Sequence, residues 1–134
     1  ITSLASPILL LFVPFIILGA NSTYGFLLLL LLINEIIGSL IKYFFYKPRP
    51  DGQEYKGILE KIDAGSFPSL HASRITIVYL TLFSYVTDIY IQVALLFMMI
   101  AVMISRVLLK RHFITDIVGG FVIGAVLWWI SGRI

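Results

Sequence analysis

Hydrophobic residues along the chain form long runs separated by short polar stretches. Five such runs occur, at residues 4–20, 24–46, 71–87, 89–109 and 112–132. A helix needs about 20 mostly apolar residues to cross a bilayer, so each run predicts a transmembrane helix. The connections between most runs are short, which favours antiparallel neighbours. The pattern predicts an all-α integral membrane helical bundle of about five transmembrane helices.

Length and composition agree with one membrane domain. The 134 residues fit a single domain, 1–134, and 60% of them are hydrophobic. The run 4–20 contains Pro7 and Pro14 and follows no basic segment, so we favour a first transmembrane helix over a signal peptide. The formal charge is +3, but the cations lie between the apolar runs. That placement fits membrane topology and phosphate binding better than a nucleic-acid partner.

The connection 47–68 is the long polar interruption between the second and third runs. Its apolar residues follow the spacing of one helix face, at Tyr55, Ile58, Leu59 and Ile62. We expect a short amphipathic helix that lies at the membrane interface over the site. An ordinary solvated connector is the alternative.

Polar residues that suit phosphate chemistry occur in three clusters. These are Lys42-x6-Arg49-Pro50, Pro68-Ser69-Leu70-His71 and Ser105-Arg106-x5-His112-x3-Asp116. They lie at the end of the second run, the start of the third, and the junction of the fourth and fifth. In an antiparallel bundle these positions share one membrane face. Because ionisable residues in a membrane are costly, their convergence predicts a functional site.

The cations of these clusters suit a phosphate group. Phosphoryl transfer spreads negative charge over three oxygens, which Lys42, Arg49 and Arg106 would stabilise. Pro68-Ser69 indicates a helix start, with Ser66 as a candidate cap. Free N–H groups at that start would face an anion, and Ser69 would add a hydroxyl.

The only two histidines of the chain predict the remaining chemistry. His112 and Asp116 are four residues apart, so on a helix they share a face. A carboxylate bonded to one ring nitrogen would leave the other free to attack phosphorus or to act as a base. His71 is then left as the general acid. The expected path is a double displacement through a phosphohistidine on His112.

These spacings resemble the three-part signature of the type 2 phosphatidic acid phosphatase family, the membrane branch of a superfamily that includes vanadium haloperoxidases. The first and third motifs match, and the second has Leu70 where the family usually has glycine. The resemblance covers residues 42–116. Family members commonly have six spans, so the resemblance implies that one N-terminal helix either lies outside this sequence or is missing.

The resemblance implies a metal-independent lipid phosphatase without a cofactor. His112 would be the nucleophile, Asp116 its partner and His71 the acid. Phosphate would be bound by Lys42, Arg49, Ser69, Arg106 and the amide of Leu70, which can still donate its N–H.

Substrate and sidedness follow from the same resemblance. The substrate would be a lipid phosphate reached from the bilayer, with polyprenyl diphosphate ahead of phosphatidic acid and phosphatidylglycerol phosphate. We expect a multi-pass protein of a prokaryotic plasma membrane with its site on the extracytoplasmic face. Nine of the ten Lys and Arg residues map to the motif face, which by the positive-inside rule favours the cytoplasm instead.

The residues alone leave two alternative functions open and predict two structural contacts. A lipid phosphotransferase would use the same site, and a non-enzymatic anion or lipid transporter would need the cations but not the His–Asp pair. Glu35 lies well inside the second run beside Asn34. A carboxylate there needs a partner, so we expect it to pair with a neighbouring helix. Gly120-x3-Gly124 predicts close helix packing in the last run.

Overall fold

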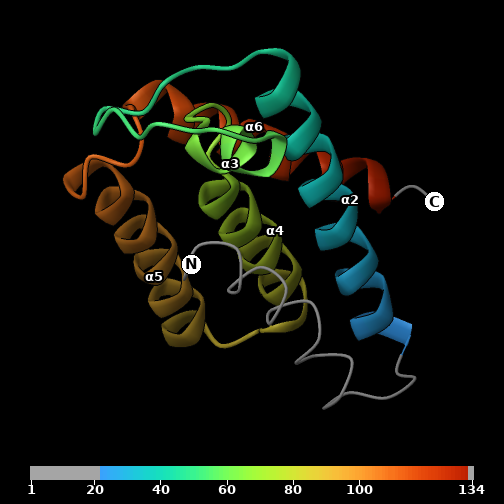
Figure 1. Ribbon diagram of the computed structural model, residues 1–134. Helices are drawn as coiled ribbons and strands as arrows, with labels where there is room; N and C mark the ends of the chain where they lie inside the picture. The colour runs from blue at the N-terminus through green and yellow to red at the C-terminus, as the bar shows by residue number, and fades with distance from the viewer. Residues whose placement is uncertain (1–21, 133–134) are drawn as a thin grey trace.

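The computed structural model describes residues 22–132, and this part of the chain is folded into helices without a strand (Figure 1). The helices are α2 (Ser22–Phe44), α3 (Ile58–Ala64), α4 (Leu70–Tyr85), α5 (Ile89–Leu108) and α6 (Ile114–Ser131). The prediction of an all-α fold is confirmed. The expected helix at 4–20 lies outside the described residues.

Three helices of the described part are long and apolar enough to cross a membrane. The segments are Gly25–Phe44, Ile89–Leu108 and Ile114–Ser131. The predicted crossing at 71–87 is indeed a helix, but α4 has only 16 residues and does not belong to this set. At 1.5 Å per residue it is about 24 Å long, shorter than a bilayer core.

Helix α4 is the central helix of the described part. Figure 1 shows it between α2 and α5, and its most extensive packing is against α6. Four residues of its first two turns are buried completely, namely Ala72, Ser73, Thr76 and Ile77. Most of them are small or hydroxyl-bearing, as is typical of helix interfaces inside membranes.

Two glycines let α6 approach α4 closely. Gly120 lies against the carbonyl of Ser69 and the methyl group of Ala72, and a Cβ at Gly124 would lie 2.6 Å from the carbonyl oxygen of Ser73. The expected role of Gly120-x3-Gly124 in packing is therefore confirmed. Because contact positions rise together along both helices, α4 and α6 run in the same direction and begin at the same end of the molecule.

The connection between α2 and α4 lies across that same end (Figure 1). It contains the predicted short helix, α3, with Ile58 and Leu59 exposed. Its two arms meet where Pro48 pairs with Gly65, and where the Ser66 N–H donates to the Lys47 carbonyl at 2.7 Å. This pairing brings the first and second sequence clusters together.

The partly buried carboxylate of Glu35 has the partner that was expected. Arg74 of α4 donates to both of its oxygens, with Nη2 2.9 Å from Oε2 and Nε also within hydrogen-bonding distance. Glu35 therefore ties α2 to α4. The neighbouring Asn34 is fully buried, and its side chain has no hydrogen-bond partner among the described residues.

Candidate active site

The start of α6 places His112 just outside the helix. Phe113 is the N-cap residue and is extended, with ψ 161°, so the helix begins only at Ile114. Asp116 occupies the third helical position, and its Oδ2 accepts a hydrogen bond of 2.7 Å from the Phe113 N–H. This is half of a capping box. The expectation that His112 and Asp116 share a helix face is wrong, because His112 precedes the helix.

A backbone carbonyl orients the His112 ring. Its Nδ1 lies 2.8 Å from the Ser66 carbonyl oxygen, while Oδ2 of Asp116 is 3.9 Å away. The sequence predicted the carboxylate as the hydrogen-bond partner, and the structure has the carbonyl in that position. Because a carbonyl only accepts, Nδ1 carries the proton in the neutral ring. The Nε2 lone pair is then the nucleophilic one.

His112 is held in its neutral form. Burial, followed by the charges of Lys42 and Arg49, lowers the pKa of His112 to about 4. Only 3% of the residue is exposed. At neutral pH the imidazole is therefore unprotonated, which is the state that a nucleophile requires.

The start of α4 supplies the second cluster. Its N-cap is Ser69 and not Ser66, since the Ser69 hydroxyl accepts from the Ala72 N–H at 3.3 Å. Leu70 and His71 are the first two helical residues, and their N–H groups have no acceptor within the helix. Ser69 is fully buried and His71 is half-buried. The helix start that the sequence predicted is confirmed, with its cap shifted by three residues.

The three predicted cations lie around the histidines. Lys42 is 4% exposed, and its charge, like that of Arg49, acts on His112. Arg106 lies within electrostatic reach of Arg49 and of His71. The structure thus brings residues of all three clusters to one end of the bundle.

Two of these cations retain unused hydrogen-bonding capacity. The Nε atoms of Arg49 and Arg106 are buried and have no acceptor among the described residues. Buried donors normally have a partner, because an unsatisfied one costs about 1–3 kcal/mol. Guanidinium groups pair well with phosphate oxygens. The unsatisfied donors are therefore suited to an anion.

Lys47 is a contact residue that the sequence motifs did not predict. Its Nζ lies 2.6 Å from Oδ1 of Asp116, 3.0 Å from the Thr115 hydroxyl and 4.6 Å from the centre of the Phe113 ring. All three partners belong to the first turn of α6 or its cap. Lys47 lies within the unspecified positions of the first motif. Only its closeness to Arg49 in the sequence could have suggested that it belongs to the site.

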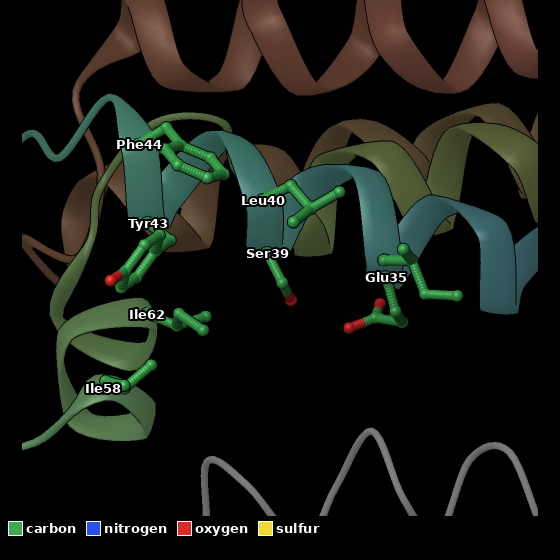
Figure 2. Close-up of a pocket in the computed structure, with 8 residues that line it drawn as sticks. Glu35, Ser39, Leu40, Tyr43, Phe44, Ile58 and Ile62 are labelled. Carbon is green, nitrogen blue, oxygen red and sulfur yellow. The ribbon is translucent and has the colours of Figure 1, made fainter.

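Two grooves lie beside this end of the bundle. One, of about 560 Å³, is lined by His112 together with apolar residues that include Val107, Phe113 and Ile114. The other, of about 500 Å³, lies between α2 and α3, where Ile58 and Ile62 face the side of α2 that carries Tyr43 (Figure 2). Both are mainly apolar. Within the described part of the chain, no group of three or more His, Asp or Glu side chains is placed to hold a metal ion.

Comparison with known proteins gives one match. The family model of the PAP2 superfamily matches residues 23–134. No curated protein and no solved structure matches the chain. The chain belongs to the PAP2 superfamily, and this membership supports phosphatase activity on phosphate esters.

Proposed function

We propose that this protein hydrolyses the phosphate or diphosphate monoester of a membrane lipid through a phosphohistidine on His112. The unsatisfied Nε donors of Arg49 and Arg106 beside a neutral, oriented imidazole support this most strongly. A metal-independent reaction needs fixed positive charge around the phosphorus. Lys42, Arg49 and Arg106 would supply it, together with the N–H of Leu70 and the Ser69 hydroxyl.

The two histidines would divide the reaction. Nε2 of His112 attacks phosphorus, and the bond from phosphorus to the lipid oxygen breaks. His71 gives its proton to that oxygen. A bound phosphate anion would favour the protonated form of His71 at this stage. Water then attacks phosphorus, the nitrogen–phosphorus bond breaks, and His71 takes the proton from water.

A lipid substrate is supported by the surroundings of the nucleophile. His112 opens onto a mainly apolar groove between the end of α5 and the start of α6, with Val107 and Ile114 in its walls. We infer that the hydrocarbon chain next to the phosphate lies in this groove. The same end of the bundle begins and ends helices that can cross a membrane, so a phosphate held there would lie near headgroup level.

Among lipid phosphates we favour polyprenyl diphosphate over phosphatidic acid and phosphatidylglycerol phosphate. The described connections, including the long one between α2 and α4, contain no separate domain to recognise a large headgroup. We also propose that the protein is a multi-pass protein of a prokaryotic plasma membrane with its site on the extracytoplasmic face, as the family resemblance implies.

A direct test is to follow radioactive phosphate from each lipid in detergent solution. The protein is mixed with a lipid labelled in its terminal phosphate, and the reaction is stopped in alkali, in which phosphohistidine survives. We expect transient label on the wild-type protein and none on His112→Ala, followed by label in inorganic phosphate. Label that passes to another lipid and not to water would identify a phosphotransferase. Turnover without labelled protein would contradict the covalent path.

A further inference from the structure

We propose that Lys47 is a positioning residue for the nucleophile, acting on His112 through Asp116 and Ser66. This inference rests on the proposed function for its kinetic consequence. Its structural basis is a chain of contacts that joins the connection after α2, the segment before α4 and the start of α6. Neither the sequence motifs nor family membership assigns a role to Lys47.

The first link is the ion pair between Lys47 and Asp116. Asp116 is fully buried, and Nζ of Lys47 lies 2.6 Å from its Oδ1. The Lys47 side chain is 36% exposed, so it reaches from the surface to a carboxylate that has no contact with solvent. A buried charge without a partner is strongly unfavourable. Lys47 therefore stabilises Asp116 as an anion.

The second link is the side chain of Ser66. Its hydroxyl is buried and donates a hydrogen bond to Oδ2 of Asp116, and the Phe113 N–H donates to the same oxygen. An ionised carboxylate can accept from both donors, whereas a protonated one would have to donate itself. The charge on Asp116 thus determines the orientation of the Ser66 side chain.

The third link is the main chain of Ser66. Its carbonyl oxygen lies 2.8 Å from Nδ1 of His112, and its N–H donates to the carbonyl of Lys47 at 2.7 Å. Ser66 is therefore fixed by Lys47 on one side and Asp116 on the other. Its carbonyl keeps the proton of His112 on Nδ1 and leaves Nε2 free.

Contacts with the start of α6 strengthen this role. Nζ of Lys47 also lies 3.0 Å from the Thr115 hydroxyl and over the Phe113 ring. These contacts engage its ammonium group with the first turn of α6 and its cap. Lys47 therefore orients His112 indirectly, through the groups that surround the start of α6.

The test combines kinetics with NMR of the nucleophile in the full-length protein. Lys47→Met removes the charge and keeps much of the side-chain volume, and Lys47→Arg restores a cation. Ser66→Ala removes only the hydroxyl. Lys56→Met is the matched control, because Lys56 is an exposed cation of the same connection. Each protein is labelled with ¹⁵N-histidine, and inorganic phosphate release from lipid phosphate is measured in parallel.

We expect Lys47→Met to lower kcat roughly 10- to 100-fold, by analogy with the loss of outer hydrogen-bond partners of metal-binding histidines. KM should stay unchanged because the phosphate-binding cations are intact. Lys47→Arg should recover most of kcat, Ser66→Ala should fall in the same direction, and Lys56→Met should match wild type. The ¹⁵N spectrum of Lys47→Met should show part of His112 in the Nε2–H form.

The outcomes separate the two proposals. A wild-type protein that releases no phosphate from any lipid contradicts the proposed function, and the tautomer of His112 still decides the role of Lys47. An unchanged tautomer in Lys47→Met and in Ser66→Ala would overturn the positioning role. So would a loss in Lys47→Met that appears in KM alone.

Discussion

Helices α4 and α5 lie side by side in the structure and differ in their apolar character and in the number of their buried residues. Helix α5 is 20 residues long and strongly apolar, yet Met99 is its one buried residue. Helix α4 has 16 residues, several of them with hydroxyl groups, and five of its residues are buried, including Ser73 and Thr76. In a bilayer, apolar side chains face lipid, whereas close helix contacts use small and polar residues. Apolar character therefore indicates a helix suited to face lipid, and buried polarity indicates a helix that packs beside the candidate site.

The contrast extends to the ends of these helices. The start of α4 meets the start of α6 and the connection after α2, and there Ser66, Ser69, His112 and Asp116 are all buried. The far end of α4 leads through a short turn into α5, where Tyr85 and Tyr90 are exposed. We expect substitutions in the first region to be costly and substitutions on α5 to be tolerated.

The largest effect on stability is expected from breaking the ion pair of α4. Glu35→Ala leaves the mostly buried guanidinium of Arg74 without its carboxylate, which should cost about 3–5 kcal/mol. Thermal unfolding in detergent measures the loss. The double variant Glu35→Ala with Arg74→Met should recover much of it, because no charge is then left unpaired. An unfolding temperature of Glu35→Ala equal to that of wild type would contradict this account of α4.

Burial at the start of α4 and α6 should also shift the titration of His112. The pKa of His112 is about 4 in the folded protein, below the usual value near 6.5. Its neutral, nucleophilic form should therefore persist as the pH falls through 6 and 5, and should be lost only near pH 4. Histidine NMR against pH measures this directly. Replacing the nearby cation in Lys42→Met should raise the midpoint, and a wild-type midpoint near 6.5 would contradict the assignment.

Packing between α4 and α6 should respond to a single methyl group. Gly120→Ala places a Cβ against the Ser69 carbonyl and should destabilise the protein by about 1–3 kcal/mol. Gly25→Ala is the matched control, because a Cβ at Gly25 meets nothing within 4 Å. Thermal unfolding of both variants measures the difference. Equal stabilities would show that the two helices are less closely packed than described.

The smallest effect is expected on α5. Phe97 is 68% exposed, so Phe97→Leu keeps an apolar surface and should change stability by no more than about 0.5 kcal/mol. The same unfolding assay measures it. A large loss would mean that this face of α5 packs against protein and not lipid.

The sequence predicted the part of this arrangement that depends on periodicity and on residue type. Four helices, the short helix α3 and the convergence of the three clusters follow from apolar spacing and from the direction of each run. The pairing of Glu35 was expected because a carboxylate inside an apolar run needs a partner. These features are local, or follow from topology alone.

The details of the site depend on contacts that no spacing encodes. Lys47 reaches Asp116 across 69 residues of sequence. The partner of His112 is a main-chain carbonyl, which every residue possesses and which therefore leaves no signal in the sequence. The helix start was predicted with Ser66 as its cap, but Ser69 caps α4 and leaves the Ser66 hydroxyl for Asp116. Tertiary contacts therefore determine which of the two serines caps α4.

The central claim is that His112 is the nucleophile of a lipid phosphatase. Its most direct test is inorganic phosphate release from polyprenyl diphosphate, phosphatidic acid and phosphatidylglycerol phosphate by purified protein with EDTA present. The account predicts turnover of at least one lipid by wild type, and a loss of roughly 1,000-fold or more in a correctly folded His112→Ala variant. Near-normal release by His112→Ala would contradict it.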